Sequence, residues 1–244
     1  MKALARWVLL VAVAAAMLEV FFIARIALMA QVDPESTAFQ RSEAWRIANQ
    51  RKGRLPWQQQ WVPYARISDH LKRAVITSED DTFVNHDGVD WEALEKAWQR
   101  NEKAEEAAAR RAQLSRAPQR PPKIVGGSTI TQQLAKNLLL SGERTLLRKG
   151  QEIVLTFALE RMLSKERILE IYLNSVEWGE GVFGAQAAAR HYYRKEASQL
   201  TPYEAARLAV MLPRPKYFEK VPNSAYLSHR ASVIVARMGG AELP

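Results

Sequence analysis

The chain has no cysteine among its 244 residues. This absence excludes disulfide scaffolds, thiolate metal sites and cysteine nucleophiles, and it is compatible with export to an oxidising compartment. The pattern Ser-x-x-Lys, a signature of serine acyl transfer, is also absent. The sequence shows no internal repeat and no ladder of alternating strands. Successive stretches with helical periodicity instead predict a mainly α fold with one globular body.

Positive charge exceeds negative charge, with 35 Lys and Arg against 26 Asp and Glu and a net charge of +9. This balance favours an anionic partner, which can be a nucleic acid, an anionic membrane surface or a phosphorylated substrate. Charge alone does not separate these three classes. The length allows one well-buried domain with a small appendage, whereas it is short for two full domains.

The first thirty residues contain a long apolar run, from Trp7 to Ala30, that only Glu19 and Arg25 interrupt. Its length exceeds the roughly 20 residues that a helix needs to cross a bilayer. Lys2 and Arg6 precede the run, and cations at one end of an anchor stay in the cytoplasm. We therefore predict a single transmembrane helix with the remainder of the chain outside the membrane.

This anchor divides the chain into two parts. Residues 1–31 are predicted to form a cytoplasmic tip and the anchor, and residues 32–244 the exported domain. A cleaved signal peptide is the alternative, because Ala14, Ala15 and Ala16 are small enough for a peptidase. Strongly apolar residues follow these alanines, however, where a mature N-terminus would be polar. Both interpretations export the rest of the chain.

The exported part begins with a polar, Gln-rich connector from about residue 31 to residue 65, and beyond it helical patterns follow one another. Ser68 and Asp90 are typical helix caps, and Thr201 opens a capping box with proline at the first helical position. The predicted helices cover residues 68–79, 90–98, 164–174, 184–193 and 201–213.

Between residues 99 and 123 the composition changes to Glu, Lys, Arg and Ala and then to a Pro-rich tail. Such a composition favours a solvated helix and a mobile loop, which we delimit as a charged insertion at about residues 100–122. Because the insertion lies between the two richest motifs, a flap over a cleft is the alternative.

The first of three chemically rich strings is Glu-Asp-Asp-Thr-Phe-Val-Asn-His-Asp-Gly, residues 79–88. Leu71, Val75 and Glu79 recur at four-residue spacing, which places the Glu79 carboxylate on the inward face of a helix near its C-terminal end. Partial burial and the helix dipole both raise the proton affinity there. Such a carboxylate can exchange a proton at physiological pH. On this string alone, a carboxylate held for structural reasons by a salt bridge or by hydrogen bonds is an equally good interpretation.

The second string is Gly-Gly-Ser-Thr-Ile-Thr-Gln-Gln-Leu-Ala-Lys-Asn, residues 126–137. Its glycines permit close backbone approach, and its amides and hydroxyls can meet an anion or sugar hydroxyls. If the chain is helical from Thr131 onward, Gln132 and Lys136 lie on one face. Taken alone the string is weak evidence, because such turns are common and no Gly-Lys-Ser/Thr closes it as in a nucleotide-binding P-loop.

The third string, residues 144–152, places Arg144, Arg148 and Glu152 at four-residue steps, with Lys149 three residues before the glutamate. A continuous helix lines these cations along the approach to one acid. An exposed, self-neutralising helix face is the ordinary interpretation of such a pattern. Together with the carboxylate and the lysine of the first two strings, it indicates two carboxylates beside several cations that can hold a diphosphate.

These three strings, in this order, resemble the motifs of the glycosyltransferase module that monofunctional peptidoglycan glycosyltransferases share with bifunctional penicillin-binding proteins. Lys-Glu-Arg-Ile-Leu-Glu-Ile-Tyr-Leu-Asn, residues 165–174, resembles a fourth motif, and residues 200–215 resemble a fifth. The likeness spans roughly residues 68–218. With no Ser-x-x-Lys nucleophile in the chain, we expect the monofunctional type, without a transpeptidase.

The resemblance implies a lysozyme-like fold with a membrane-associated jaw, in the inner membrane of a bacterium with the catalytic domain on the periplasmic side. It implies lipid II, the undecaprenyl-diphosphate-linked disaccharide pentapeptide, as substrate. The growing glycan would be transferred with inversion onto the 4-hydroxyl of lipid II, which forms a β-1,4 bond and releases undecaprenyl diphosphate. No organic cofactor is expected, and a divalent cation, Mg²⁺ or Mn²⁺, can accompany the diphosphate. Expected partners are the growing glycan, the membrane and proteins of cell-wall synthesis or division, but no nucleic acid.

Carried over motif by motif, the resemblance also implies residue roles. Glu79 would be the general base for the acceptor hydroxyl, and Glu152 would assist near the donor diphosphate. His86 is expected to brace its loop rather than to titrate. The expected substrate-binding residues are Lys136, Arg144, Arg148, Lys149, Gln132, Gln133, Ser128, Thr129, Asp80 and Phe83.

Two rival functions share parts of this pattern. A lysozyme-like hydrolase would share a catalytic glutamate and helical fold, but it has no need of a cationic diphosphate site. A non-catalytic membrane-tethered scaffold would use the basic surface alone and would be indifferent to the loss of Glu79. Nucleic-acid binding is disfavoured, because the basic residues surround acids and an export signal precedes them.

Overall fold

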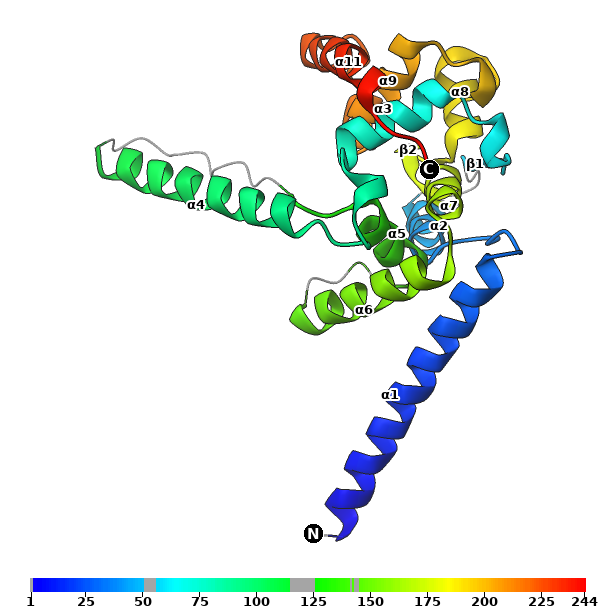
Figure 1. The fold of residues 1–244 in the computed structure, drawn as a ribbon, viewed down its shortest axis with the longest axis vertical. Coiled ribbons are helices and arrows are strands. Elements are labelled where there is room, and N and C mark those ends of the chain that lie inside the picture. The colour runs from blue at the N-terminus through cyan, green and yellow to red at the C-terminus, as the bar shows by residue number, and fades with distance from the viewer. Residues whose placement is uncertain (1, 51–55, 115–125, 141, 143–144) are drawn as a thin grey trace.

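The computed structural model describes the chain except for residues 1, 51–55, 115–125, 141 and 143–144. Helices dominate the described part, and its strands are few and short, which confirms the prediction of a mainly α fold (Figure 1). The lysozyme-like comparison that the resemblance implied stays a prediction.

The N-terminal apolar run forms one continuous helix, α1 (Lys2–Met29), whose N-terminal half stands clear of the rest of the chain (Figure 1). Its most apolar window has a mean hydropathy of 2.5 and is 6% buried. Among the described residues it is the one helix long and apolar enough to cross a membrane. This confirms the prediction of an N-terminal helix suited to be an anchor.

The C-terminal half of α1 docks on the body. Ile26 and Met29 are buried there, and Gln151 of helix α6 donates a hydrogen bond of 3.2 Å to the Glu19 carboxylate. The Arg167 guanidinium donates to the carbonyl oxygen of Met29 at 2.8 Å. Glu19, the charge that interrupts the anchor, is thus a point of contact between α1 and the globular body.

The polar connector is more ordered than its composition indicated, because it contains helix α2 (Ala38–Gln50). Thr37 and Gln40 exchange hydrogen bonds at the start of this helix, each backbone N–H meeting the side chain of the other residue at 2.8 and 3.0 Å. This is the geometry of a capping box. The polar connector predicted over residues 31–65 included no helix, so the prediction missed these thirteen residues.

The remaining helices build one body around a continuous apolar core. Helix α3 packs against α9 and α11 at one end, while α5 packs against α2, α6 and α7 at the other. Their bounds are α3 (Asp69–Glu79), α5 (Ile130–Leu139), α6 (Leu146–Met162), α7 (Lys165–Ser175), α8 (Ala185–Tyr193), α9 (Pro202–Met211), α10 (Pro215–Phe218) and α11 (Ala225–Arg237). Short 3-10 turns lie at Tyr64–Arg66, Phe83–Asn85, Ala197–Gln199 and Met238–Gly240.

The predicted caps are present where the local sequence placed them. Ser68 accepts from the backbone N–H of His70 at the start of α3, and Asp90 accepts from that of Ala93 at 2.7 Å. Thr201 and Glu204 form a complete capping box at α9, with Pro202 at the first helical position. Helix starts in this chain are therefore encoded locally.

A small sheet escaped the sequence analysis. It has the order β1-β3-β2, from β1 (Gln58–Gln59), β2 (Glu177–Gly179) and β3 (Val182–Phe183). β1 pairs with β3 in parallel and β2 pairs with β3 antiparallel. Strands of two or three residues are too short to show an alternating pattern, so only tertiary contacts specify them.

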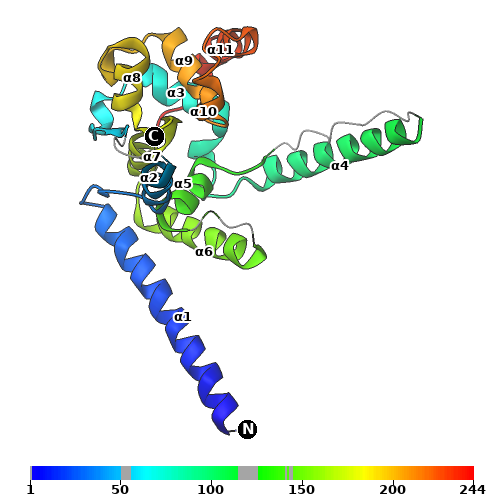
Figure 2. The same ribbon diagram turned by 180° about the vertical axis from the view of Figure 1, so that it is seen from behind.

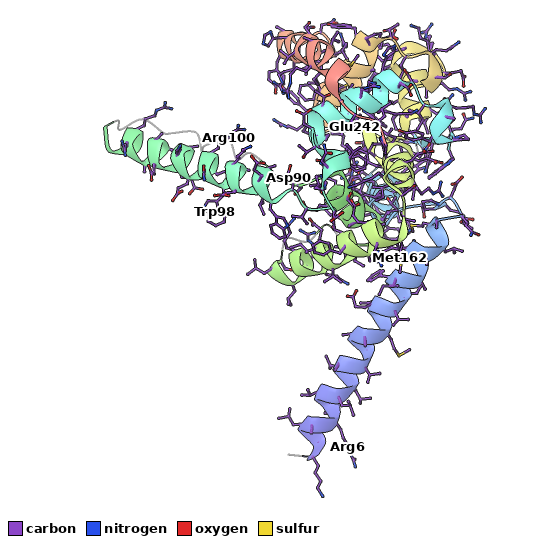
Figure 3. All side chains as sticks on the ribbon, in the orientation of Figure 1. Arg6, Asp90, Trp98, Arg100, Met162 and Glu242 are labelled. Carbon is purple, nitrogen blue, oxygen red and sulfur yellow. The ribbon has the colours of Figure 1, made fainter. Side chains whose placement is uncertain are left out.

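Helix α4 (Trp91–Leu114) extends away from the body in both views (Figures 1 and 2). It contains the first part of the charged insertion, and residues 115–122 of that insertion lie outside the described residues. Trp98 and Arg100 point to opposite sides of the helix (Figure 3). The predicted solvated helix is confirmed for the described part, which contributes none of the described residues that line the cleft discussed below.

Candidate active site

A cleft of about 1140 Å³ runs between α2, α5, the start of α6 and the segment that follows α9. Its walls carry both charge signs. Lys136, Arg148, Lys149 and Glu152 line one part, and Glu43 and Glu177 line another. Further lining residues come from the second string, from the motif at residues 165–174 and from the missed helix; they include Ser128, Gln132, Gln133, Asn137, Tyr172, Phe39 and Arg41.

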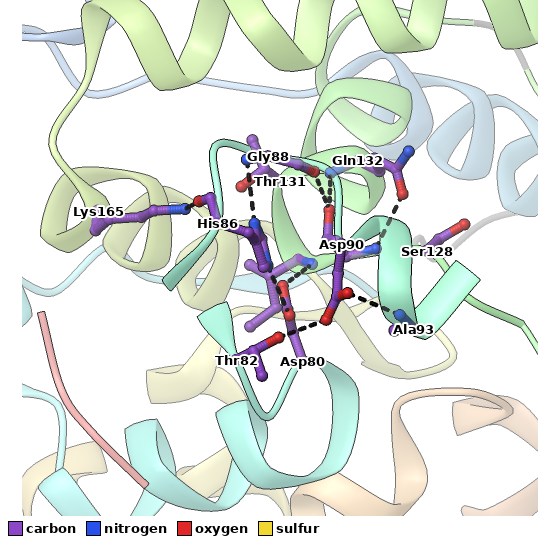
Figure 4. A network of polar contacts seen from close by, with 12 residues as sticks. Asp80, Thr82, His86, Gly88, Asp90, Ala93, Ser128, Thr131, Gln132 and Lys165 are labelled. Carbon is purple, nitrogen blue, oxygen red and sulfur yellow. Dashed lines mark hydrogen bonds and ion pairs between the residues drawn. The ribbon is translucent and has the colours of Figure 1, made fainter. Parts of the chain in front are cut away.

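The loop that follows α3 is braced by Asp80, which is 7% exposed. One carboxylate oxygen of Asp80 lies 2.9 Å from His86 Nε2, and the other accepts from the backbone N–H of Ile130 at 2.9 Å (Figure 4). His86 Nδ1 accepts from the backbone N–H of Gly88. These contacts join the first string to the start of α5, and they agree with the bracing role expected for His86.

Thr129 and Gly88 tie the first two strings together a second time. The Thr129 hydroxyl donates to the carbonyl oxygen of Gly88 at 2.6 Å and accepts from the backbone N–H of Gln132. Gly88 has φ +89°, and a Cβ there would lie 2.7 Å from the Thr156 side chain of α6. A residue with a side chain is excluded by both the backbone angle and the contact, so glycine is required at this turn.

Glu79 ends α3, and its side chain is directed to α5 rather than to a salt bridge. Gln133 donates to Glu79 Oε2 at 3.0 Å, and the Tyr172 hydroxyl donates to Gln133 Oε1 at 3.0 Å. Burial raises the pKa of Glu79, as does the neighbouring Asp80 carboxylate, while the Gln133 hydrogen bond and the charge of Lys136 oppose this rise. The raised pKa that the sequence analysis predicted is therefore present, and burial is its largest cause.

The cationic part of the cleft is organised by Glu152, which is 3% exposed. Arg148 donates to one of its carboxylate oxygens at 2.9 Å, and Lys149 donates to the other. These are the ion pairs at three- and four-residue spacing that the third string predicted. Lys136 of α5 is exposed on the same cleft. Glu152 therefore holds two cations in place beside a third.

The structure separates the predicted substrate-binding residues into groups. Ser128 is exposed at the cleft, whereas Thr129 is buried as the cap of α5. Asp80 and Phe83 lie inside the fold; Phe83 is fully buried, with the Lys165 ammonium 4.6 Å from its ring centroid. Their geometry supports the loop rather than an open ligand surface. Arg144 lies outside the described residues.

An ionic cluster that includes two acids of the cleft lining, Glu43 and Glu177, was not predicted from the sequence. Glu43 of α2 accepts from Arg46, and Lys216 of α10 contacts both Glu43 and Glu177. Burial raises the pKa of the Glu177 carboxyl to about 7, although Lys216 opposes this shift. The residues of this cluster come from segments more than 130 positions apart, so no local pattern could have revealed them.

The described residues do not fit a metal ion held by the protein. They contain no group of three or more Asp, Glu or His side chains able to hold one. In the cationic part of the cleft, Arg148 and Lys149 already occupy both oxygens of Glu152. The chemistry of this donor set therefore matches an anion better than a cation, and we derive no step through a metal.

The transglycosylase family model matches residues 47–239, which include all of the strings described above. This chain belongs to the transglycosylase family. Curated relatives are named biosynthetic peptidoglycan transglycosylase, among them a protein of Burkholderia thailandensis that is 51% identical over 93% of this chain and 82% of its own length. One of Paraburkholderia xenovorans is 51% identical over 96% of this chain and 90% of its own.

As a transglycosylase of peptidoglycan, the chain is an enzyme that polymerises glycan strands of the bacterial cell wall. This confirms the family resemblance and the activity that it implied. A transglycosylase needs a base for the acceptor and counter-charge for the leaving group. Three cations line one part of the cleft, and the partly buried Glu79 carboxylate accepts a hydrogen bond from Gln133 of its wall. The cleft is therefore the candidate active site.

Proposed function

We propose that this transglycosylase joins the growing glycan to lipid II with Glu79 as the general base. The Glu79 carboxylate takes the proton of the acceptor 4-hydroxyl while the hydroxyl oxygen attacks the anomeric carbon of the donor. The bond from that carbon to the diphosphate breaks, and the lipid diphosphate leaves with the electron pair. Attack opposite to the leaving group inverts the α-linked donor to a β-1,4 bond.

The observation that carries this proposal is the environment of Glu79. A carboxylate with a raised pKa is a stronger base than an exposed one, and Gln133 fixes one of its oxygens. Its hydrogen bonds come from the neutral side chains of Gln133 and Ser78, whereas Arg148 and Lys149 both bond Glu152. We therefore assign the base to Glu79 and the ordering of the cations to Glu152.

Lys136, Arg148 and Lys149 would hold the donor diphosphate. Their charges face one part of the cleft, and counter-charge at a leaving diphosphate stabilises the transition state more than the ground state. Ser128, Gln132 and Gln133 add hydrogen-bonding groups along the same wall. We propose that a divalent cation, Mg²⁺ or Mn²⁺, enters with the diphosphate rather than as a resident of the protein.

The expected location is the bacterial inner membrane with the body on the periplasmic side. Helix α1 is suited to cross the bilayer, and Lys2 and Arg6 at its start favour a cytoplasmic N-terminus. The body would then face the compartment in which lipid-linked disaccharides are polymerised. Proteins of cell-wall synthesis or division would be its partners there.

The experiment that tests this proposal compares wild type and Glu79→Gln on labelled lipid II in detergent, with products resolved by gel before and after muramidase digestion. Wild type should form muramidase-sensitive ladders, and Glu79→Gln should lose about 10²- to 10⁴-fold in turnover, the usual worth of a general base. Glu166→Gln, an exposed acid of α7, is the matched control and should be unchanged. A folded Glu79→Gln variant with near-normal turnover would remove Glu79 as the base.

The same assay separates the rival functions. Breakdown of preformed glycan without polymer formation would identify a hydrolase. No product under several detergent and divalent-ion conditions, from protein shown to be folded, would favour a scaffold. Polymer from wild type that is stopped by Glu79→Gln contradicts both rivals.

A further inference from the structure

Tyr172 of α7 is a buried tyrosine, 1% exposed, whose hydroxyl is directed to the catalytic cleft. The hydroxyl donates to Gln133 Oε1 at 3.0 Å. Burial raises the pKa of Tyr172 well above its usual value, and the negative charges of Glu79 and Asp80 raise it further. The hydroxyl therefore keeps its proton at neutral pH and remains a hydrogen-bond donor.

Gln133 transmits this donation to Glu79. Because the Tyr172 hydroxyl takes the amide oxygen, the amide nitrogen faces Glu79 Oε2 at 3.0 Å and the backbone oxygen of Ser128 at 3.5 Å. The reversed amide would place its oxygen against the carboxylate, which is tolerated only when Glu79 carries a proton. The orientation of Gln133 is thus coupled to the charge of Glu79.

We propose that Tyr172 is a positioning residue of the transfer reaction, acting through Gln133 to keep Glu79 ionised and to fix Oε2, so that Oε1 is available to the acceptor hydroxyl. This inference rests on the proposed role of Glu79 as the base. We call the hydrogen bonds from Tyr172 to Gln133 and from Gln133 to Glu79 the relay. Its residues lie on three helices: Glu79 ends α3, Gln133 lies in α5, and Tyr172 lies in α7. Ser78 Oγ, 3.5 Å from Oε1, is the neighbouring polar group on α3.

The charges that face Glu79 set the direction of the effect. Asp80, next in sequence, raises the pKa of Glu79, as burial does, and Lys136 of α5 lowers it. The Gln133 hydrogen bond is the largest contribution that lowers this pKa. Weakening the relay therefore raises the pKa of Glu79 and leaves less of the base ionised at neutral pH.

Tyr172→Phe tests the relay, because phenylalanine fills the same space without the hydroxyl. Polymerisation of lipid II is measured from pH 5 to pH 9 with the full-length enzyme in detergent. We expect kcat to fall about three- to tenfold at pH 7 and the acid limb of the kcat profile to move up by about half to one pH unit, as for the loss of one hydrogen bond to a charged group. KM should stay within about twofold, because the Tyr172 hydroxyl donates to Gln133 and not to the substrate.

Tyr193→Phe is the matched control, since the Tyr193 hydroxyl donates at 3.4 Å to the backbone oxygen of Glu204, between α8 and α9. It should leave the pH profile unmoved. In a Gln133→Ala background, Tyr172→Phe should add less than about a twofold loss, because the relay is already broken. Additive losses, a raised KM with an unmoved limb, or a lower melting temperature with a normal profile would each overturn the proposal.

The outcomes also separate this inference from the proposed function. If Glu79→Gln keeps its turnover, the assignment of the base fails whatever Tyr172→Phe does. If Glu79→Gln is inactive and Tyr172→Phe behaves like wild type, the base stands and the relay is wrong.

Discussion

The carboxyl group of Glu177 differs from that of Glu79 in having two acids, Glu43 and Glu180, and one cation, Lys216, around it. Burial raises its pKa from 4.5 to about 7, with Glu43 and Glu180 adding to the rise and Lys216 opposing it. A folded-state pKa above the unfolded value means that the folded chain binds the proton more tightly. The stability from this proton is complete below about pH 4.5 and is lost as pH rises to about 7.

Glu177→Gln should remove this pH dependence, because glutamine resembles the protonated acid at every pH. We expect little change at pH 5 and a gain on the order of 1–3 kcal/mol relative to wild type at pH 8. Chemical denaturation of both proteins in detergent at pH 5 and pH 8 measures their free energies of unfolding. Glu166→Gln, an exposed acid of α7 outside this cluster, is the control and should keep the wild-type dependence. An unchanged difference between pH 5 and pH 8 in Glu177→Gln would contradict this assignment.

The sequence predicted the environment of Glu79 but not the hydrogen bond from Tyr172 to Gln133, and the reason is physical. The environment of Glu79 follows from the periodicity of its own helix, so its burial was predictable. The partner of Tyr172 lies on another helix, 39 positions away in the chain. A tyrosine on an apolar stripe signals that its hydroxyl needs a partner, but not which one.

Helix α5 has an N-cap residue, Thr129, that does more than start the helix. Thr129 caps it through the backbone N–H of Gln132 and also donates to the Gly88 carbonyl, which joins α5 to the loop that follows Glu79. Thr201 caps α9 by a similar capping box. The first cap should therefore support the active site, and the second only its own helix.

We expect Thr129→Ala to destabilise the enzyme by about 1–3 kcal/mol and Thr201→Ala by about 0.5–1.5 kcal/mol, since the first loses a buried hydrogen bond as well as a cap. Thr129→Ala should also reduce turnover, because α5 carries Gln133 and Lys136. Thr129→Ser should have close to wild-type stability and turnover. Melting curves and lipid II turnover provide the measurements, and equal losses of stability and activity in the two alanine variants would refute the difference.

Helix α2 shows where element prediction fails. Its capping residues, Thr37 and Gln40, were legible in the sequence, but the helix has few apolar positions and lies in a Gln-rich stretch. Burial of Ile47 and ion pairs to α10 and Glu180 stabilise it instead. Because those partners follow in the chain more than 130 residues later, composition indicated a connector where the fold has a cleft wall.

For the whole molecule, the position of the body relative to the bilayer follows from how α1 docks. Gln151 of α6 meets Glu19, ten residues before the end of α1, so α6 lies beside the helix that is suited to cross the membrane. Leu146 and Leu147, at the start of α6, are 91% and 88% exposed. Large apolar side chains that are exposed on a helix beside the membrane-crossing helix are stabilised by lipid rather than by water.

The absence of cysteine offers a direct test of this arrangement. A single cysteine introduced by Leu147→Cys carries an environment-sensitive fluorophore in proteoliposomes, and doxyl-labelled lipids serve as quenchers. Tyr226→Cys is the matched control, because Tyr226 is also exposed, at 51%, but begins α11 on the side of the body away from the N-terminal half of α1 (Figure 1). We expect strong quenching at position 147 and little at position 226. Equal quenching at the two positions would show that α6 does not contact the bilayer, and that α1 tethers the body without setting its height above the membrane.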